Sequence, residues 1–154
     1  MNELSASDLM EIMPEATSFV RSFISEGWPA ESAEFLVGPP LRLGQAAGVS
    51  NDDGALVMLI TWAFLSRHLA DDIERNGDRL LHPSEWNEGT VPWVVDLYSA
   101  EGVSQSVRRT LRSLADRFGT VNTVISDSQG NRWKATITTS SSRRVWSRQK
   151  LGCL

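Results

Sequence analysis

The feature that most constrains this chain is an unbroken run of largely apolar residues over positions 55–65, Ala-Leu-Val-Met-Leu-Ile-Thr-Trp-Ala-Phe-Leu. The run is rich in β-branched and aromatic side chains, which favour a strand. A strand without a polar face is buried on both sides, so the run predicts a central strand with helices packed on it. Its 11 residues are too few to cross a bilayer as a helix, which needs about 20 residues.

The sequence before this strand predicts a hairpin. Residues 51–54 read Asn-Asp-Asp-Gly, which is a strong turn signal. They join the apolar run to residues 41–49, where weak alternation of small side chains indicates the preceding strand. We therefore expect two neighbouring antiparallel strands here.

Helices are predicted upstream of the hairpin. Residues 8–24 carry apolar side chains at intervals of three and four, with Ser7 as a candidate cap. Pro14 either kinks this helix or begins it, because proline is tolerated in a first turn. Residues 30–37 predict a second, short helix that the Gly-Pro-Pro of residues 38–40 stops.

The second half of the chain predicts a buried strand and the clearest helix. Residues 68–76 indicate a short helix ended by glycine, and residues 78–90 a loop. Residues 91–98 (Val-Pro-Trp-Val-Val-Asp-Leu-Tyr) predict a second buried strand, in which Asp96 is the one charge. Ser104–Phe118 has a single apolar stripe and Ser104 as its candidate cap.

The C-terminal third predicts a hairpin, followed by a stretch for which two structures are possible. Thr120–Ser126 and residues 132–139 form the expected hairpin, and residues 140–154 are either a loose tail or a late element. A chain of 154 residues suits one domain, so we assign residues 1–140 to the domain and residues 141–154 to a basic C-terminal tail. The order of elements predicts an α+β fold with a mixed sheet flanked by helices.

Charge is divided unevenly along the chain. Residues 1–102 hold 5 Lys and Arg against 17 Asp and Glu, a net charge of −12, whereas residues 103–154 hold 10 against 2, a net charge of +8. A basic third on an acidic protein suggests a polyanionic partner, such as nucleic acid, a phosphorylated cofactor or an acidic protein. The alternative is a solvated basic face. No reader motif for nucleic acid is present, so we expect no nucleic-acid partner.

The start of the Ser104–Phe118 helix is a candidate phosphate site. Gly102 and Ser104 follow a buried strand directly, and free backbone N–H groups at a helix start can hold phosphate. The side chains of Arg108, Arg109 and Arg112 lie mainly off the apolar stripe and offer paired donors to phosphate or carboxylate. We predict that these residues bind a phosphate or carboxylate group of a partner.

Several kinds of site are not expected. His68, His82 and Cys153 are too far apart in the sequence for a recognisable metal site, and the one cysteine excludes an internal disulfide. The sequence has no Gly-rich phosphate loop or dinucleotide fingerprint. The first residues are acidic and lack the basic start of a secretory signal, so we expect a cytoplasmic protein without a membrane span.

The sequence resembles the toxin-activating lysine acyltransferases, the family that activates haemolysin-type RTX protoxins. The resemblance covers about residues 7–140, and its order and spacing fit across five segments. The segments are Gly27-Trp28-Pro29, Pro39-Pro40-Leu41-Arg42-Leu43-Gly44-Gln45, Thr61-Trp62-Ala63-Phe64-Leu65-Ser66, Trp86-Asn87-Glu88-Gly89, and Trp93-Val94-Val95-Asp96 running on to Gly102.

The resemblance implies a fold, an activity and a catalytic pair. It implies a GNAT-like fold and transfer of a fatty acyl group from acyl carrier protein to lysines of a protoxin, in the bacterial cytoplasm and often by a homodimer. The family's pair is an aspartate, matched by Asp96, and a histidine just before the Trp-Pro, where this chain has Ser25. The chain is therefore a divergent member, with changed chemistry, a different acceptor or no catalysis.

The candidate residues have structural alternatives. Asp96 is the candidate base, because burial raises a carboxyl pKa toward a useful range; otherwise it accepts structural hydrogen bonds. Ser25 binds water or substrate, carries the acyl group, or simply bonds its own backbone. His68 replaces the missing base or is a polar surface residue. Trp62 and Trp93 are core residues or line an acyl groove.

Two functions follow from these readings. The first is an acyltransferase that uses acyl carrier protein, or coenzyme A, as carrier and modifies a lysine or other amine of a protoxin or small precursor peptide. It needs no permanently bound cofactor. We expect the donor to be bound by Arg108, Arg109, Arg112, Gly102 and Ser104. The second is an inactive relative that binds acyl carrier protein or a toxin as an adaptor, which the loss of the histidine favours.

Overall fold

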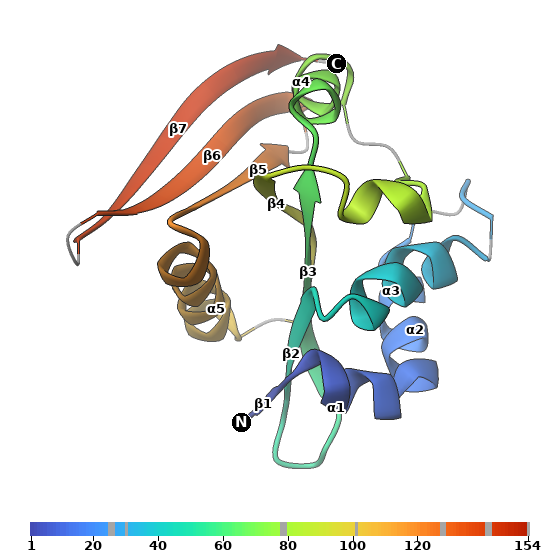
Figure 1. Ribbon diagram of the computed structural model, residues 1–154. Coiled ribbons are helices and arrows are strands. Elements are labelled where there is room, and N and C mark those ends of the chain that lie inside the picture. Colours follow the sequence, from blue (N-terminus) through green and yellow to red (C-terminus); the bar gives the residue numbers. More distant parts are fainter. Residues whose placement is uncertain are drawn as a thin grey trace.

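The computed structural model describes residues 1–24, 27–29, 31–77, 80–100, 102–126, 129–140 and 143–153. Within these residues one seven-stranded sheet has the strand order β1-β2-β3-β4-β5-β6-β7 (Figure 1). All its neighbouring pairs are antiparallel except β4 and β5, which are parallel. The strands are β1 (Asn2–Leu4), β2 (Ala46–Ser50), β3 (Leu56–Leu65), β4 (Val91–Ser99), β5 (Thr120–Ser126), β6 (Asn131–Ser140) and β7 (Arg143–Cys153).

Helices lie on both sides of the first four strands (Figure 1). They are α1 (Ala6–Glu11), α2 (Met13–Arg21), α3 (Ser32–Arg42), α4 (Arg67–Asn76), α5 (Ser104–Phe118) and a 3₁₀ turn, η1 (Pro83–Trp86). Helices α1 to α3 cover one face and α5 the other (Figure 1). This arrangement confirms the predicted α+β class with a mixed sheet flanked by helices. None of the described helices is long and apolar enough to span a membrane.

The apolar run is the central strand β3, as predicted. Leu59 packs into the cluster formed with α1, α2 and α3, whereas Ile60 and Trp62 pack into the cluster formed with α5. Successive side chains of a strand point to opposite faces. Both faces of β3 are therefore buried, which is why the run has no polar side.

The predicted turn over residues 51–54 joins β2 to β3. The side-chain oxygen of Asn51 accepts hydrogen bonds from the backbone N–H groups of Asp53 and Ala55, at 3.0 and 2.9 Å. Gly54 has a φ of +83°, a conformation that glycine adopts without steric cost. Residue identity alone was sufficient to predict this turn.

The N-terminal helices differ from the prediction in two details. Ser5, not Ser7, caps α1, because its side chain and that of Asp8 form a reciprocal capping box. Pro14 lies in the first turn of α2, so it begins a helix, as one of the two predicted alternatives has it. The chain bends at Ile12, between the two helices.

The predicted end of the next helix was wrong. Helix α3 continues through Pro39 and Pro40 to Arg42, and β2 begins only at Ala46. Proline removes backbone donors, but the carbonyl groups of Pro39 and Pro40 still accept bonds from Leu43 and Gln45, at 3.1 and 2.8 Å. This stretch of α3 is buried, and burial of its apolar surface outweighs the lost hydrogen bonds.

The second half follows the prediction more closely. The helices α4 and α5 and the strands β4, β5 and β6 all form where the sequence predicts them. The prediction of Ser104 as the cap of α5 was wrong, because the N-cap residue is Val103 and no side chain caps the helix. Of the two alternatives for residues 140–154, the structure has the late element, since Arg143–Cys153 forms β7 and pairs with β6.

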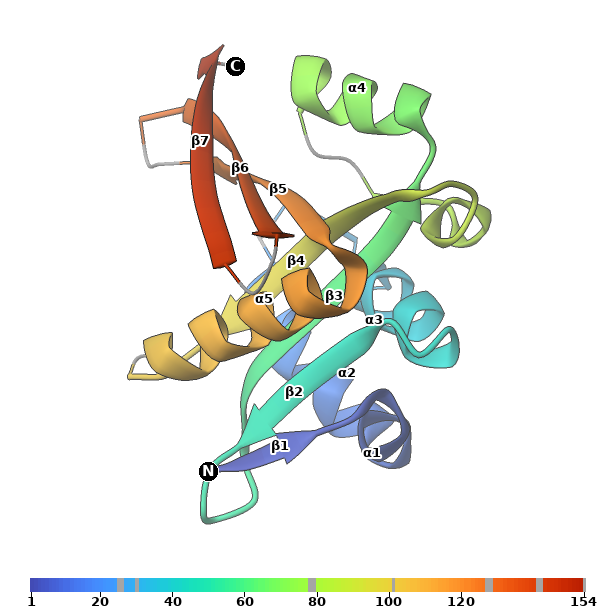
Figure 2. The ribbon, with the colours of Figure 1, turned by 60° about the vertical axis from the view of Figure 1, so that its left-hand side comes forward.

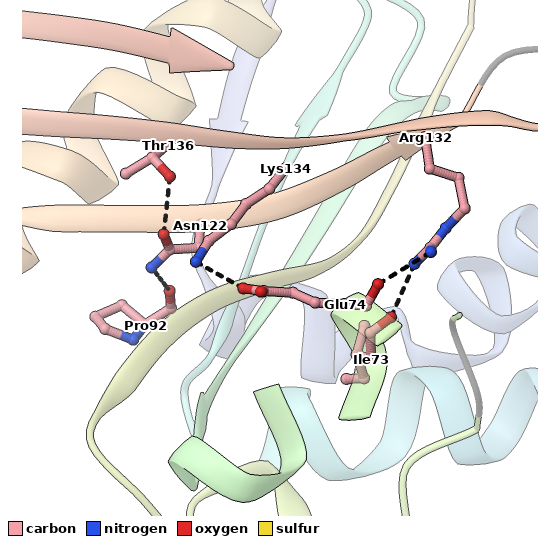
Figure 3. Close-up of polar contacts among 7 residues, drawn as sticks. All are labelled: Ile73, Glu74, Pro92, Asn122, Arg132, Lys134 and Thr136. Atoms are coloured by element: carbon pink, nitrogen blue, oxygen red, sulfur yellow. Dashed lines mark hydrogen bonds and ion pairs between the residues drawn. The ribbon is translucent and has the colours of Figure 1, made fainter. Parts of the chain in front are cut away.

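Strands β4 and β5 meet at one short stretch. Within the described residues their register is a single pair, Trp93 with Asn122. Polar side chains reinforce it: Asn122 Nδ2 donates to the Pro92 carbonyl at 3.2 Å, and Thr123 Oγ1 donates to the Val94 carbonyl at 3.0 Å. Figure 3 shows the first of these bonds, and Figure 2 shows the two strands diverging. The second half of β4 is thus separated from β5.

Two cations of β6 connect α4 to the sheet (Figure 3). The guanidinium of Arg132, which is buried, donates to the carbonyl oxygens of Ile73 and Glu74 at 2.8 and 3.1 Å. Lys134 Nζ lies 2.6 Å from the Glu74 carboxylate. Cationic donors satisfy the carbonyl groups at the end of a helix. The end of α4 is therefore fixed beside β6.

Candidate active site

The site begins with a β-bulge in β4. Asp96 is paired in register with Thr61 of β3, but the next residue of β3, Trp62, is paired with Val94. Val95 is therefore the extra residue. A bulge shifts the alternation of a strand by one position, so Trp93 and Asp96 both lie on the face of β4 that meets Leu36 of α3 and Ile73 of α4.

A small cavity lies beside Asp96. Its volume is about 50 Å³ and its walls come from the segment after α2 and from α3, α4 and β4. At about 10–15 Å³ for each water-sized group, it holds a few non-hydrogen atoms. Most of the wall is apolar, and Asp96 supplies a carboxylate to it. The lining residues are Trp28, Leu36, Ile73, Leu81, Trp93, Val95 and Asp96.

Tyr98 is the polar neighbour of Asp96 on the same face of β4. Burial raises the pKa of the Tyr98 phenol above its usual range, and the negative charge of Asp96 and a hydrogen bond to it raise that pKa further. The phenol therefore remains protonated and donates to the carboxylate. Its ring is 5.5 Å from that of Phe23, between ring centroids.

Thr61 completes the polar surroundings of the bulge. It is fully buried, and its Oγ1 has no hydrogen-bond partner within the part of the chain that the structure describes. A buried hydroxyl of this kind is uncommon in a folded protein. This hydroxyl lies on the β3 residue that is paired in register with Asp96.

The structure does not bring all the predicted catalytic residues together. Ser25 lies outside the described residues, although Trp28 shortly after it lines the cavity. His68 is exposed on α4 and is not among the residues that line the cavity; Ile73 of the same helix is. Asp96 is therefore the predicted catalytic residue that the cavity contains.

The predicted arginines form a basic surface on α5. Arg108, Arg109 and Arg112 are exposed and line an open groove of about 590 Å³, together with Arg144 of β7. Its remaining lining residues are Gln105, Ser113 and Asp116. Such a cluster of guanidinium groups suits phosphate or carboxylate.

Two acidic side chains neutralise part of this surface. Arg144 pairs with Asp116, and its hydrogen bond holds the pKa of that carboxyl below its ordinary value. Arg109 lies 3.6 Å from the Glu3 carboxylate in an exposed pair. Exposed ion pairs of this kind contribute little to the free energy of unfolding. For Arg108 and Arg112 the structure gives no comparable ion pair among the described residues, so they are the most available cations.

The predicted phosphate-binding start of α5 is open to solvent. Gly102 and Ser104 are both exposed, and Gly102 has a φ of +83°. The first backbone N–H groups of α5 receive no side-chain cap. A role for these two residues in binding the donor remains a prediction.

Sequence reasoning missed Tyr98, Trp28 and Ile73 as members of the site. The sequence could have indicated Tyr98, because it lies two residues after Asp96 on a predicted strand and residues two apart on a strand share a face. Trp28 lies in a segment that carried the family resemblance. Ile73 had no signal, since only the packing of α4 against β4 brings it to Asp96.

No group of three or more His, Cys, Asp and Glu side chains is placed to bind a metal among the residues that the structure describes. No protein-family model and no curated protein matches the sequence. Among solved structures, the fold is similar to that of an acetyltransferase of the GNAT family from Listeria monocytogenes, with a TM-score of 0.47 and 10% sequence identity. The match covers 94% of this chain and 90% of that chain.

Proposed function

We propose that this protein is an acyltransferase that moves an acyl group from a thioester donor to an amine. The sequence resemblance specifies a fatty acyl group, acyl carrier protein as donor, and a lysine of a protein or peptide as acceptor, in the bacterial cytoplasm. The observation that carries the proposal is the bulge in β4. It presents a carboxylate to a small, mostly apolar cavity at the point where β4 and β5 separate.

The chemistry requires a base beside the amine. A lysine amine is mostly protonated at neutral pH and must lose a proton before it attacks a carbonyl carbon. In the proposed reaction Asp96 accepts that proton. The amine nitrogen bonds to the thioester carbonyl carbon and the carbon–sulfur bond breaks. The nitrogen loses its second proton as the amide forms, and the leaving thiolate takes up that proton. The cavity holds only these reacting groups, so a long acyl chain must extend beyond it.

The second half of β4 is suited to the arm of the donor. Its backbone pairs with β3 on one side, and on the other side it has separated from β5. Unpaired strand groups bind an extended amide chain through main-chain hydrogen bonds. A pantetheine arm, shared by acyl carrier protein and coenzyme A, is such a chain. Arg108, Arg109 and Arg112 would then hold the acidic carrier or its phosphate.

The adaptor function is the second candidate. It is favoured by Ser25 at the family's histidine position and by the exposed position of His68 away from the cavity. In that case the same surfaces bind the carrier, but no acyl group is transferred.

The test is intact-mass analysis of candidate acceptors incubated with the protein and acyl donors of several chain lengths. We expect an increment equal to the acyl group, and a fall of about 10² or more in kcat for Asp96→Asn, the usual size of a general-base effect. Asp71→Asn, which changes an exposed carboxylate on α4, is the matched control. Circular dichroism checks that both variants fold.

Two outcomes would contradict the proposal. Binding of the carrier without any mass increment, across all donors and acceptors, would establish the adaptor instead. Transfer that is unchanged in Asp96→Asn would assign the reaction to another site. His68→Ala separates a further case: a loss as large as that of Asp96→Asn would show that His68 has replaced the missing base.

A further inference from the structure

We propose that the outer edge of β7 binds an acidic polypeptide segment in extended conformation, which adds to the sheet as a further strand. This inference concerns binding and goes beyond the acyl transfer proposed above. It rests on the position of β7, on the exposure of its residues and on the alternation of its charges.

Strand β7 is a long edge. It pairs with β6 from Arg143 to Cys153 and is the last strand of the sheet, so its other side has no strand beside it in the described residues (Figure 2). Residues 143–150 are all exposed. An uncovered edge presents a row of N–H and C=O groups that pair readily with another chain.

The side chains of β7 favour a partner with negative charge. The strand contains Arg143, Arg144, Arg148 and Lys150 and no acidic residue. The register places Arg144, Trp146, Arg148 and Lys150 on the same face, opposite Thr139, Ile137, Ala135 and Trp133 of β6. Three of these four β7 side chains are cations, and the fourth is the exposed indole of Trp146.

Some of these cations are held in place by the protein itself. Arg144 is fixed by Asp116, and the guanidinium of Arg148 lies 4.8 Å from the ring centroid of Trp133. Trp146 also borders a groove of about 370 Å³ with Arg108, Leu111 and Arg112 of α5. The charged face of β7 is therefore continuous with the basic surface of α5.

The charge and the backbone groups of β7 together indicate which kind of partner binds there. A second copy of this chain, paired through its own β7, would bring two sets of like charges together, which is unfavourable across a strand pair. Nucleic acid matches the charge, but it does not match the backbone N–H and C=O groups of an edge strand. An extended peptide with Asp or Glu at every second position satisfies both requirements.

The experiment compares three labelled probes by fluorescence anisotropy. The first is a short peptide that alternates Glu with Thr or Val. The second keeps every Glu but has Pro in the other positions, which removes their backbone N–H donors and fixes their φ at about −65°, away from the value of a regular strand. The third is an oligothymidylate of equal charge. We expect the alternating peptide to bind about tenfold or more tighter than either of the others, because only it forms strand hydrogen bonds.

Hydrogen exchange supplies an independent readout. In the complex with the alternating peptide, the β7 amides that face away from β6 should exchange more slowly. Equal affinity for the alternating and the proline peptides, tighter binding of the oligonucleotide, or no binding of any probe would each overturn the proposal.

Substitution of one cation locates the site. Lys150→Glu retains the Arg148–Trp133 contact and should lower the affinity for the alternating peptide by about threefold to tenfold. Arg75→Glu makes the same charge change at an exposed position of α4 and should leave the affinity within about twofold, as expected for a remote surface charge. Equal effects of the two substitutions would show attraction by net charge alone.

Discussion

The centre of the sheet and its last strand differ in what covers their faces. Strands β2 to β4 lie between helices, and the central residues Met58, Leu59 and Ile60 of β3 are fully buried. Strand β7 is exposed along residues 143–150 and carries four cations. The covered strands hold the carboxylate and the cavity, where the exclusion of water strengthens electrostatic effects. The exposed strand β7 presents charge and the backbone groups of an edge strand.

Two tryptophans give the sharpest test of this difference. Trp86 has no exposed surface, whereas Trp146 on β7 is about half exposed. Trp86→Ala should lower the free energy of unfolding by about 3–5 kcal/mol, the cost of a large cavity in a core. Trp146→Ala should change it by less than about 0.5 kcal/mol, as surface substitutions do. Urea denaturation measures both, and similar losses would mean that β7 is packed in solution.

Two arginines extend the test to charged residues. Arg132 is buried and satisfies two carbonyl groups of α4, whereas Arg148 is exposed on β7. Arg132→Met should cost about 1–3 kcal/mol of unfolding free energy, because it leaves buried carbonyl groups without a donor. Arg148→Met should cost less than about 1 kcal/mol, since it loses only an exposed cation–π contact. A negligible effect at Arg132 would show that α4 does not depend on β6.

The basic surface of α5 should affect the donor and not the fold. Replacing Arg108, Arg109 and Arg112 by Ala should raise the donor KM by about tenfold and flatten its dependence on salt, because exposed charges act through screened attraction. Steady-state kinetics at low and high ionic strength measure both effects. Replacing Arg21, Arg67 and Arg75, which are exposed on α2 and α4, by Ala is the control for the three lost charges. Unchanged donor kinetics would assign docking to another surface.

Tyr98 gives the smallest effect and the most specific signal, because the chain contains one tyrosine. Burial, followed by the charge and hydrogen bond of Asp96, raises the pKa of its phenol. The folded protein therefore keeps this proton above about pH 10, where the unfolded chain releases it, and the free energy of unfolding falls as the pH rises further.

The ultraviolet absorbance of phenolate follows Tyr98 directly. We expect no phenolate in the folded protein at pH values where a free tyrosine ionises, and its appearance together with unfolding. Tyr98→Phe should lose less stability than the wild-type protein over the same rise in pH. Ordinary titration near pH 10 in the folded state would contradict the contact with Asp96.

Sequence reasoning succeeded where local pattern and burial agree. The double-sided apolarity of β3 predicted its place at the centre, and the stripe of α5 predicted the bounds of that helix. It failed at the Gly-Pro-Pro of α3, because the local signal to stop a helix was overridden by burial of that stretch in the core. It was also wrong about Ser104, because Val103 is buried at the cap position and no side-chain oxygen is used.

The sequence by itself determined the buried strands β3 and β4, the helix α5, the division of charge and the presence of one carboxylate in an apolar strand. These properties follow from side-chain polarity and spacing, which act locally. Only the tertiary structure decided that Val95 bulges, that Trp28 and Ile73 meet Asp96, and that His68 is exposed on α4. Such contacts join residues far apart in the chain, and they depend on the register of β3 with β4 and on the packing of α4 against the sheet.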